Sequence, residues 1–164
     1  MSKNVIADMI LYFGNDVKRI NHALKVYGFA LAISGSEEVT GDELEIIALT
    51  ALLHDIGVKE AERKYSSSAW NYQEIEGPPV ARKILEKNGI ADKITERVCF
   101  IIARHHSYDK IEGQDFQILV EADLIVNLFE KNSSRESIDE VRNKYFKTDS
   151  GQSLLESIYL SGKG

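Results

Sequence analysis

His54 and Asp55 lie side by side at the end of the most apolar segment of the chain, residues 46–53, in which Thr50 is the one polar side chain. A segment that is apolar on nearly every side is typical of a buried helix, and we expect Gly57 to end this helix at the C′ position. Both desolvation and the helix dipole disfavour a carboxylate at such a place. A bound metal cation is the simplest compensating charge.

Further imidazole and carboxylate groups fall within or at the ends of predicted core helices, at His22, His105, His106 and Asp123. Asp123 has apolar neighbours one helical turn away, at Leu119, Val120 and Val126. Nitrogen and oxygen ligands without thiolates suit Zn, Mn, Fe or Ni. If the helices form one bundle, four of these side chains can converge on one ion, as in other bundle-core metal sites: His22, His54, Asp55 and Asp123.

Each of these residues also has an interpretation without a metal. A lone buried histidine such as His22 is usually hydrogen-bonded within the core. Asp55 could form an ion pair at the helix end, and Asp123 could be a buried cap or an ion-pair partner. Of His105 and His106, one could interact with the helix dipole while the other is exposed to solvent.

Helical periodicity dominates the chain, and no alternating strand pattern or internal repeat is present. We predict helices over residues 5–13, 16–34, 41–54, 74–88, 94–105 and 118–126, then one that starts after Ser134 and one over 153–160. Residues 59–64 could form a further short polar helix. Gly77-Pro78-Pro79 suits the first turn of its helix, and a serine-rich loop over 65–71 holds Trp70. The predicted fold is an all-α single-domain bundle of seven to eight helices over 1–164, with a motif-bearing core at about 16–130 and peripheral helices at about 134–161.

Composition narrows the class of protein. The chain has 164 residues, 43% of them hydrophobic, and a net charge of −6, which disfavours general nucleic-acid binding. Cys99 is the single cysteine, so no internal disulfide forms, as is usual in a reducing cytoplasm. We see no signal peptide or membrane-spanning run and expect a cytoplasmic protein. Apolar residues near the C-terminus leave room for a homodimer contact, at Ile158, Tyr159 and Leu160.

The order His … His-Asp … Asp resembles the HD superfamily of metal-dependent phosphohydrolases. The matching segments lie within residues 20–128, at 22–26, 52–57 and 121–123. The resemblance implies an all-α fold and divalent-metal hydrolysis of phosphate esters, often nucleotides. It implies that the metal ligands are His22, His54, Asp55 and Asp123, and that His105 and His106 are similar to paired histidines that complete a binuclear site in some members.

The sequence departs from the cyclic-dinucleotide phosphodiesterase branch of that superfamily. Gln73 stands where that branch has a further histidine, with Glu74 and Glu76 nearby as either ligands or first-turn residues. Val58 follows His-Asp-Ile-Gly where the branch has lysine, and Lys59 comes one place later. The glycine-tyrosine-proline signature of the branch is also absent. These differences argue against cyclic-dinucleotide cleavage.

A metal-dependent reaction assigns roles to particular side chains. A metal lowers the pKa of bound water and polarises a phosphoryl oxygen, and Asp55 is placed to ligate the metal and orient that water. His105 or His106 could hold a second ion, contact the phosphate or protonate the leaving oxygen. The candidate phosphate clamps are Lys59, Arg82 and Arg104, which could equally be surface charges. The candidate stacking residues are Tyr108, Tyr72 and Trp70, of which Trp70 could instead anchor its loop.

We therefore predict a phosphohydrolase that uses one or two divalent ions (Mn, Fe, Ni, Co, Zn or Mg) and cleaves a phosphate ester of a small phosphorylated metabolite such as a nucleotide. We expect no bulk nucleic acid or membrane as a partner. One alternative is a non-hydrolytic HD-like sensor that binds a nucleotide in the same pocket. Another is a metal-free helical interaction domain, in which protein groups alone stabilise the buried Asp-His cluster.

Overall fold

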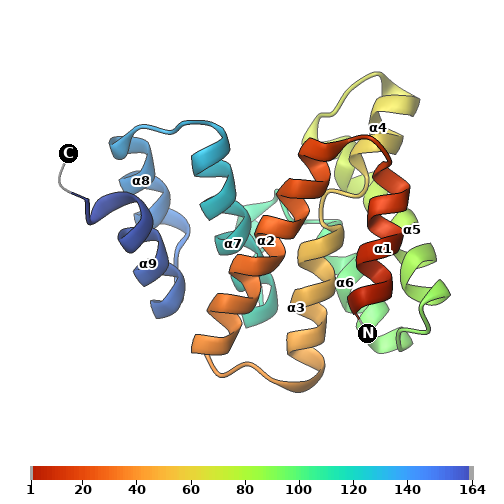
Figure 1. The fold of residues 1–164 in the computed structure, drawn as a ribbon, viewed down its shortest axis with the longest axis horizontal. Helices are drawn as coiled ribbons and strands as arrows, with labels where there is room; N and C mark the ends of the chain where they lie inside the picture. Colours follow the sequence, from red (N-terminus) through yellow and green to blue (C-terminus); the bar gives the residue numbers. More distant parts are fainter. Residues whose placement is uncertain (1, 163–164) are drawn as a thin grey trace.

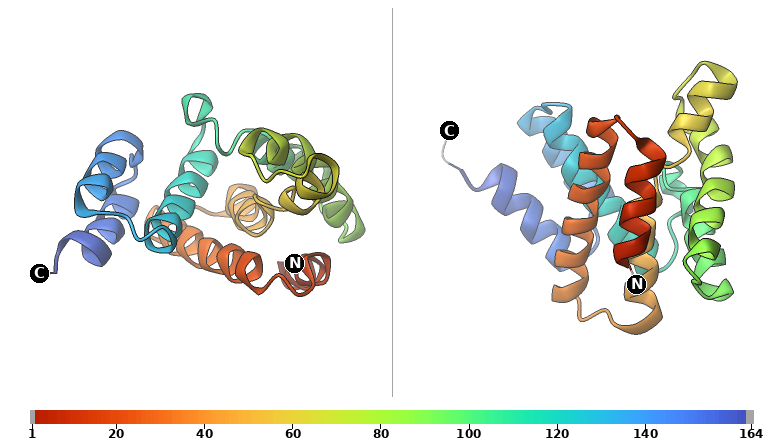
Figure 2. Two further views of the ribbon diagram at one scale, coloured as in Figure 1. Left: turned by 90° about the horizontal axis from the view of Figure 1, so that it is seen from above. Right: turned by 45° about the vertical axis from the view of Figure 1, so that its right-hand side comes forward.

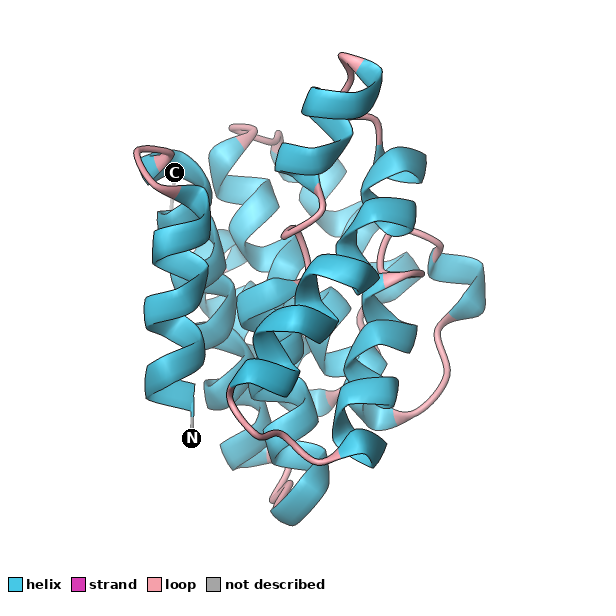
Figure 3. Ribbon diagram, turned by 90° about the vertical axis from the view of Figure 1, so that its right-hand side faces the viewer, coloured by secondary structure: helices cyan, strands magenta, loops and turns pink. Residues whose placement is uncertain are grey.

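The computed structural model describes residues 2–162, and all regular structure in that range is helical (Figure 3). Its α-helices are α1 (Ser2–Phe13), α2 (Val17–Ser36), α3 (Gly41–Leu53), α4 (Val58–Tyr65), α5 (Trp70–Lys87), α6 (Asp92–Ile102), α7 (Gln114–Glu130), α8 (Arg135–Tyr145) and α9 (Asp149–Leu155). A 3-10 turn, η1 (Tyr108–Lys110), precedes α7, and a π-helical turn, η2 (Glu156–Leu160), follows α9. The prediction of an all-α single-domain bundle is confirmed.

Helix α3 lies at the centre of the bundle. It contacts α1, α2, α6 and α7, and Figure 2 shows it enclosed by the helices around it. Every residue from Ile46 to Leu53 is buried, as its continuous apolar sequence predicts. The residues that follow this helix, His54 and Asp55, are therefore delivered to the interior.

Helices α8 and α9 lie at one edge of the molecule, on the side away from α1, α4 and α5 (Figure 1). They are tied to α7 by the buried carboxylate of Glu121, which accepts hydrogen bonds from Lys147 N at 2.7 Å and from Thr148 N at 2.9 Å. None of the helices in residues 2–162 has the length and hydropathy that a bilayer crossing requires.

The predicted position of the proline pair was wrong. Pro78 and Pro79 lie inside α5, which already begins at Trp70, so the expected loop shrinks to residues 66–69. A proline in a helix interior removes a backbone donor and disfavours the helix by about 3 kcal/mol. Gly77, which precedes the pair, presses against Ile102 of α6 so closely that an added Cβ would lie 2.7 Å from its side chain. Packing of α5 on its neighbours therefore outweighs local propensity here.

Gly57 is required for a different reason from the one predicted. Its φ of −72° is ordinary for any residue, so it is not a left-handed C′ cap. An added Cβ would instead lie 2.5 Å from the Gln73 carbonyl oxygen and 2.5 Å from the Gly77 amide nitrogen. Glycine therefore lets the turn after α3 lie directly on the backbone of α5.

Several predicted helix ends also moved, including both ends of α7, which spans Gln114–Glu130. The last helix begins at Asp149, four residues earlier than predicted, because the Thr148 hydroxyl caps it by accepting from Gly151 N at 2.9 Å. Helix α6 ends at Ile102, so His105 and His106 lie in the turn that follows it.

Candidate metal centre

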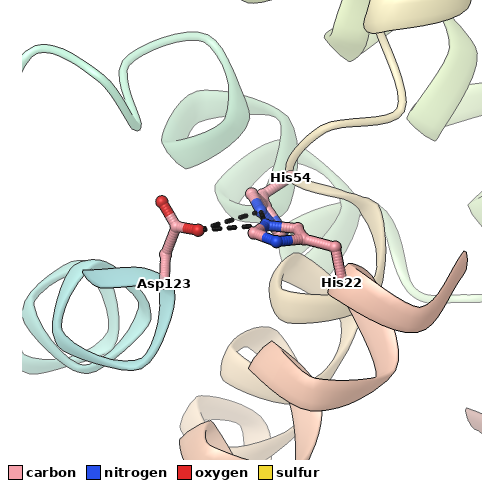
Figure 4. A group of neighbouring side chains, drawn as sticks. All are labelled: His22, His54 and Asp123. Atoms are coloured by element: carbon pink, nitrogen blue, oxygen red, sulfur yellow. Dashed lines mark hydrogen bonds and ion pairs between the residues drawn. The ribbon is translucent and has the colours of Figure 1, made fainter. Parts of the chain in front are cut away.

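Three helices bring an imidazole or a carboxylate to one buried point. Figure 4 shows His22 from α2, His54 after α3 and Asp123 from α7 turned toward one another. The two Nε2 atoms are 3.2 Å apart, and the Asp123 Oδ1 lies 3.1 Å from that of His22 and 3.5 Å from that of His54. The convergence that the sequence predicted for these residues is present.

The outer nitrogen of each ring is already used. His54 donates from Nδ1 to the Ala51 carbonyl at 2.9 Å, and His22 donates from Nδ1 to the Glu130 carboxylate at 3.0 Å. In the neutral rings, both Nε2 atoms therefore carry a lone pair directed at the other and at Asp123. Three lone-pair donors around one point need a cation or a proton between them.

Asp55 lies between this cluster and a second one, which Asp55 itself forms with His105 and His106. Its Oδ2 is 3.5 Å from the Nε2 atoms of both His22 and His54. Its Oδ1 is 3.2 Å from His105 Nε2 and 3.9 Å from His106 Nε2. The side chains of the predicted primary site and of the predicted histidine pair are thus brought together through one carboxylate.

In the second cluster, as in the first, imidazole lone pairs face the centre of the cluster. His105 donates from Nδ1 to the Ile102 carbonyl at 2.8 Å, so its Nε2 lone pair faces Asp55 when the ring is neutral. His106 Nε2 is buried and has no hydrogen-bond partner among the described residues. Such an orphaned nitrogen is what a ligand position requires.

The spacing of these atoms fits a divalent ion. Ligand bonds of about 2.1 Å place neighbouring ligand atoms about 3.0–3.4 Å apart in octahedral or tetrahedral geometry. The Nε2 atoms of His22 and His54 lie 3.1–3.5 Å from each other and from the nearest carboxylate oxygens of Asp55 and Asp123. The residues present therefore fit a metal site made of nitrogen and oxygen ligands.

The electrostatics of the cluster follow from its burial. Desolvation disfavours protonated His54, but the carboxylates of Asp55 and Asp123 outweigh it and raise the pKa to about 9. Desolvation would raise the pKa values of the two carboxylates, yet the neighbouring histidines hold both well below the usual range. His106 is different, because burial and the charge of His105 lower its pKa to about 4.

A cavity of about 280 Å³ opens beside the cluster, and His22 and Asp55 form part of its wall. Two cations of the first turn of α2, Lys18 and Arg19, also line it. Sequence reasoning missed both. They lie four and three residues before His22, and this helical spacing to a ligand is the signal that could have identified them. Arg19 is paired with Asp16 and, at 2.6 Å, with Glu62.

Four predicted contact residues do not line this cavity. Lys59 donates to the Tyr12 carbonyl at 2.6 Å, and Arg82 pairs with Glu96 at 2.6 Å. Arg104 lies over the Phe100 ring on another face, and Trp70 is 56% exposed at the start of α5. Each of these three cations has a local partner outside the cavity, as expected for structural surface charges and not for phosphate clamps.

Tyr108 is half-buried and packs against Tyr145, with ring centroids 4.7 Å apart. It does not line the cavity either. Burial and the charge of Asp123 raise the pKa of its hydroxyl. Tyr72 stacks on Tyr65 at 4.1 Å between centroids.

The two glutamates near Gln73 have structural partners. Glu74 accepts from His106 N at 3.1 Å and from the Ser107 hydroxyl at 3.2 Å, so it fixes the turn that carries the histidine pair. Glu76 accepts from Tyr65 at 2.9 Å and pairs with Lys64, which joins α4 to α5. Gln73 itself lines the cavity.

Comparison with known families identifies the fold. The family model described as HD domain matches residues 19–146, a range that contains every residue of both clusters. The chain belongs to the HD domain family. HD domains bind divalent metals and are generally metal-dependent hydrolases, in keeping with the two groups of side chains that could hold a metal here.

A solved structure supports the HD domain architecture over most of the chain. It is a predicted HD superfamily hydrolase from an uncultured Thermotogales bacterium, with a TM-score of 0.69 and 21% sequence identity. The alignment covers 94% of this chain and 83% of that protein. A comparison with curated proteins found no significant match.

Proposed function

We propose that this HD domain hydrolyses a phosphate ester of a small phosphorylated metabolite, with a nucleotide as the leading candidate. The reaction would use one divalent ion held by His22, His54, Asp55 and Asp123. The observation that carries the proposal is the convergence of these four ligand groups at the wall of a cavity that two cations also line. A divalent ion at such a site lowers the pKa of water and polarises a phosphoryl oxygen. Manganese, iron, nickel, cobalt, zinc and magnesium are all compatible with this ligand set.

The cavity favours a small anionic ligand. Its volume of about 280 Å³ is just below the range of about 300–1,000 Å³ that is typical of small-molecule sites. Lys18 and Arg19 line its wall together with Asp16, Asp55 and Glu130. Arg19 pairs with Asp16 and Glu130 pairs with Lys25, and the proposed divalent ion would add positive charge beside Asp55. Arginine and lysine beside a metal cluster are suited to bind phosphate oxygens. Gln73 and Asn127 add uncharged hydrogen-bonding groups for the rest of the ligand.

Asp55 and the histidine pair supply the remaining groups. With one carboxylate oxygen toward each cluster, Asp55 can ligate and also orient an attacking water. We propose that His105 and His106 hold a second ion or contact the phosphate. The lowered pKa of His106, about 4, makes it neutral at pH 7 and therefore a poor proton donor to a leaving group.

The test is turnover with defined metals. Metal-free protein would be reloaded with Mn²⁺, Co²⁺, Ni²⁺ or Mg²⁺ and assayed against an aryl phosphate and a panel of nucleotides. We expect metal-dependent release of phosphate or nucleotide product that falls at least about 100-fold in His54→Ala and in Asp55→Ala. Tight nucleotide binding without turnover in any metal would contradict hydrolysis and favour a sensor. Absence of metal binding by the native protein would support an interaction domain.

A further inference from the structure

Helix α7 presents three polar side chains on the face that carries Asp123. Asp123, Asn127 and Glu130 are spaced by four and three residues, so they lie along one stripe of the helix. Asn127 donates from Nδ2 to Asp123 Oδ1 at 2.9 Å. Glu130 reaches across to α2 and accepts from His22 Nδ1 at 3.0 Å. One ligand and the supports of two ligands therefore come from a single helix face.

The position of Glu130 is unfavourable unless its partners compensate. It is the last residue of α7, where the helix dipole disfavours a negative charge. Its side chain is only 21% exposed, and both of its oxygens are used, because Oε1 accepts from Lys25 at 2.6 Å while Oε2 accepts from His22. The carboxylate is thus held between the ammonium group of Lys25 and the buried ring of His22.

The contact with His22 has a chemical consequence. A carboxylate only accepts hydrogen bonds, so the His22 nitrogen that faces Glu130 must carry the proton. This fixes the tautomer in which Nε2 carries a lone pair toward His54 and Asp123. A carboxylate behind a metal-binding histidine also orients the ring and raises its basicity.

We propose that Glu130 is a positioning residue that prepares His22 to bind the metal, and that Lys25 serves as its counter-ion. This inference rests on the proposed metal site. If Glu130 only formed an ion pair with Lys25 that joins α2 to α7, its loss would not specifically weaken metal binding. The proposed role predicts that it does.

The test is calorimetric titration of metal-free protein with Mn²⁺. The same titration of His22→Ala identifies the binding step that depends on the His22 imidazole. In that step we expect Glu130→Ala to weaken affinity by about 10–100-fold. Glu130→Gln, whose amide oxygen still accepts from Nδ1, should restore affinity to within about 3-fold of the native protein. Lys25→Ala removes the counter-ion but keeps the acceptor, and it should also stay within about 3-fold.

Each other outcome has a defined meaning. Native affinity in Glu130→Ala would overturn the inference, as would equal losses in Glu130→Ala and Lys25→Ala, because these would indicate a purely structural ion pair. If circular dichroism showed that Glu130→Ala had lost helix, Glu130→Met, which keeps the side-chain length without an acceptor, would decide the question in the same way. Failure of the native protein to bind Mn²⁺ would instead contradict the proposed function.

Discussion

At the scale of single residues, the chemistry of the cluster depends on what separates its lone pairs. The Nε2 atom of His54 lies 3.5 Å from oxygens of both Asp55 and Asp123, and its Nδ1 is committed to the Ala51 carbonyl. Without a metal, a proton must lie between these atoms, which is the physical reason for the raised pKa of His54. Metal and proton therefore compete for one place.

This competition predicts the pH dependence of metal binding. With a pKa of about 9, against about 6.5 in an unfolded chain, His54 is protonated in the metal-free protein at pH 7. Mn²⁺ binding at pH 7 should therefore release at least about one proton, and affinity should rise with pH up to about 9. Calorimetry in two buffers of different ionisation enthalpy measures the release, and a heat that is the same in both buffers would contradict it.

The raised pKa of His54 also affects the stability of the metal-free fold. A histidine whose pKa is higher in the folded state contributes stability that is fully present below its unfolded pKa, about 6.5, and is lost as pH rises through the folded value, about 9. Excess Mn²⁺ should remove this dependence, because the bound ion takes the place of the proton.

At the scale of elements, the turn between α3 and α4 positions the site by direct backbone contact. Gly57 lies two residues after Asp55 and touches the backbone of α5 at Gln73 and Gly77. Gln73 in turn lines the cavity. The distance of α5 from the cluster is therefore set by the absence of a side chain at residue 57.

Gly57→Ala should destabilise the protein by about 1–3 kcal/mol, because its Cβ would meet two backbone atoms at 2.5 Å that cannot move independently. Gly28→Ala is the matched control. Gly28 is exposed within α2 with nothing within 4 Å of an added Cβ, so this change should stabilise the helix by about 0.5–1 kcal/mol. Urea unfolding monitored by circular dichroism compares the two, and equal stabilities would contradict the packing described for Gly57.

At the scale of the whole molecule, the C-terminal helices depend on one buried carboxylate. Glu121 is fully buried and accepts from two backbone amides, the Thr148 hydroxyl and Gln117. An added Cβ at Gly151 would lie 1.9 Å from its Oε2, so α9 approaches Glu121 as closely as glycine allows. The edge of the bundle is thus fixed by polar contacts rather than by apolar packing alone.

Glu121→Ala should lower the free energy of unfolding by about 2–4 kcal/mol, because it leaves the buried amide and hydroxyl of Thr148 and the part-buried amide of Lys147 without acceptors. In a protein of this size, the melting temperature should fall by roughly 5–15 °C. Glu140→Ala, an exposed position on α8, should change it by less than about 2 °C. A melting temperature for Glu121→Ala as high as that of Glu140→Ala would show that the contacts are not required.

The sequence was most informative where burial is continuous. The apolar run before His54 predicted a central helix, and the apolar neighbours of Asp123 predicted its buried position. It failed where distant packing decides, as at Pro78 and Pro79, which the contacts of Gly77 keep within a helix. Composition also cannot show which cations line the cavity, so Arg82, which pairs with Glu96, was a candidate clamp, while Lys18 and Arg19 in the cavity wall were missed.

The measurement that tests the central claim most directly is anomalous diffraction from crystals grown with excess Mn²⁺. We predict a manganese peak about 2.0–2.2 Å from the Nε2 atoms of His22 and His54 and from oxygens of Asp55 and Asp123. A second peak beside His105 and His106 would establish a two-ion site. Crystals without a manganese peak among the first four side chains would contradict the account.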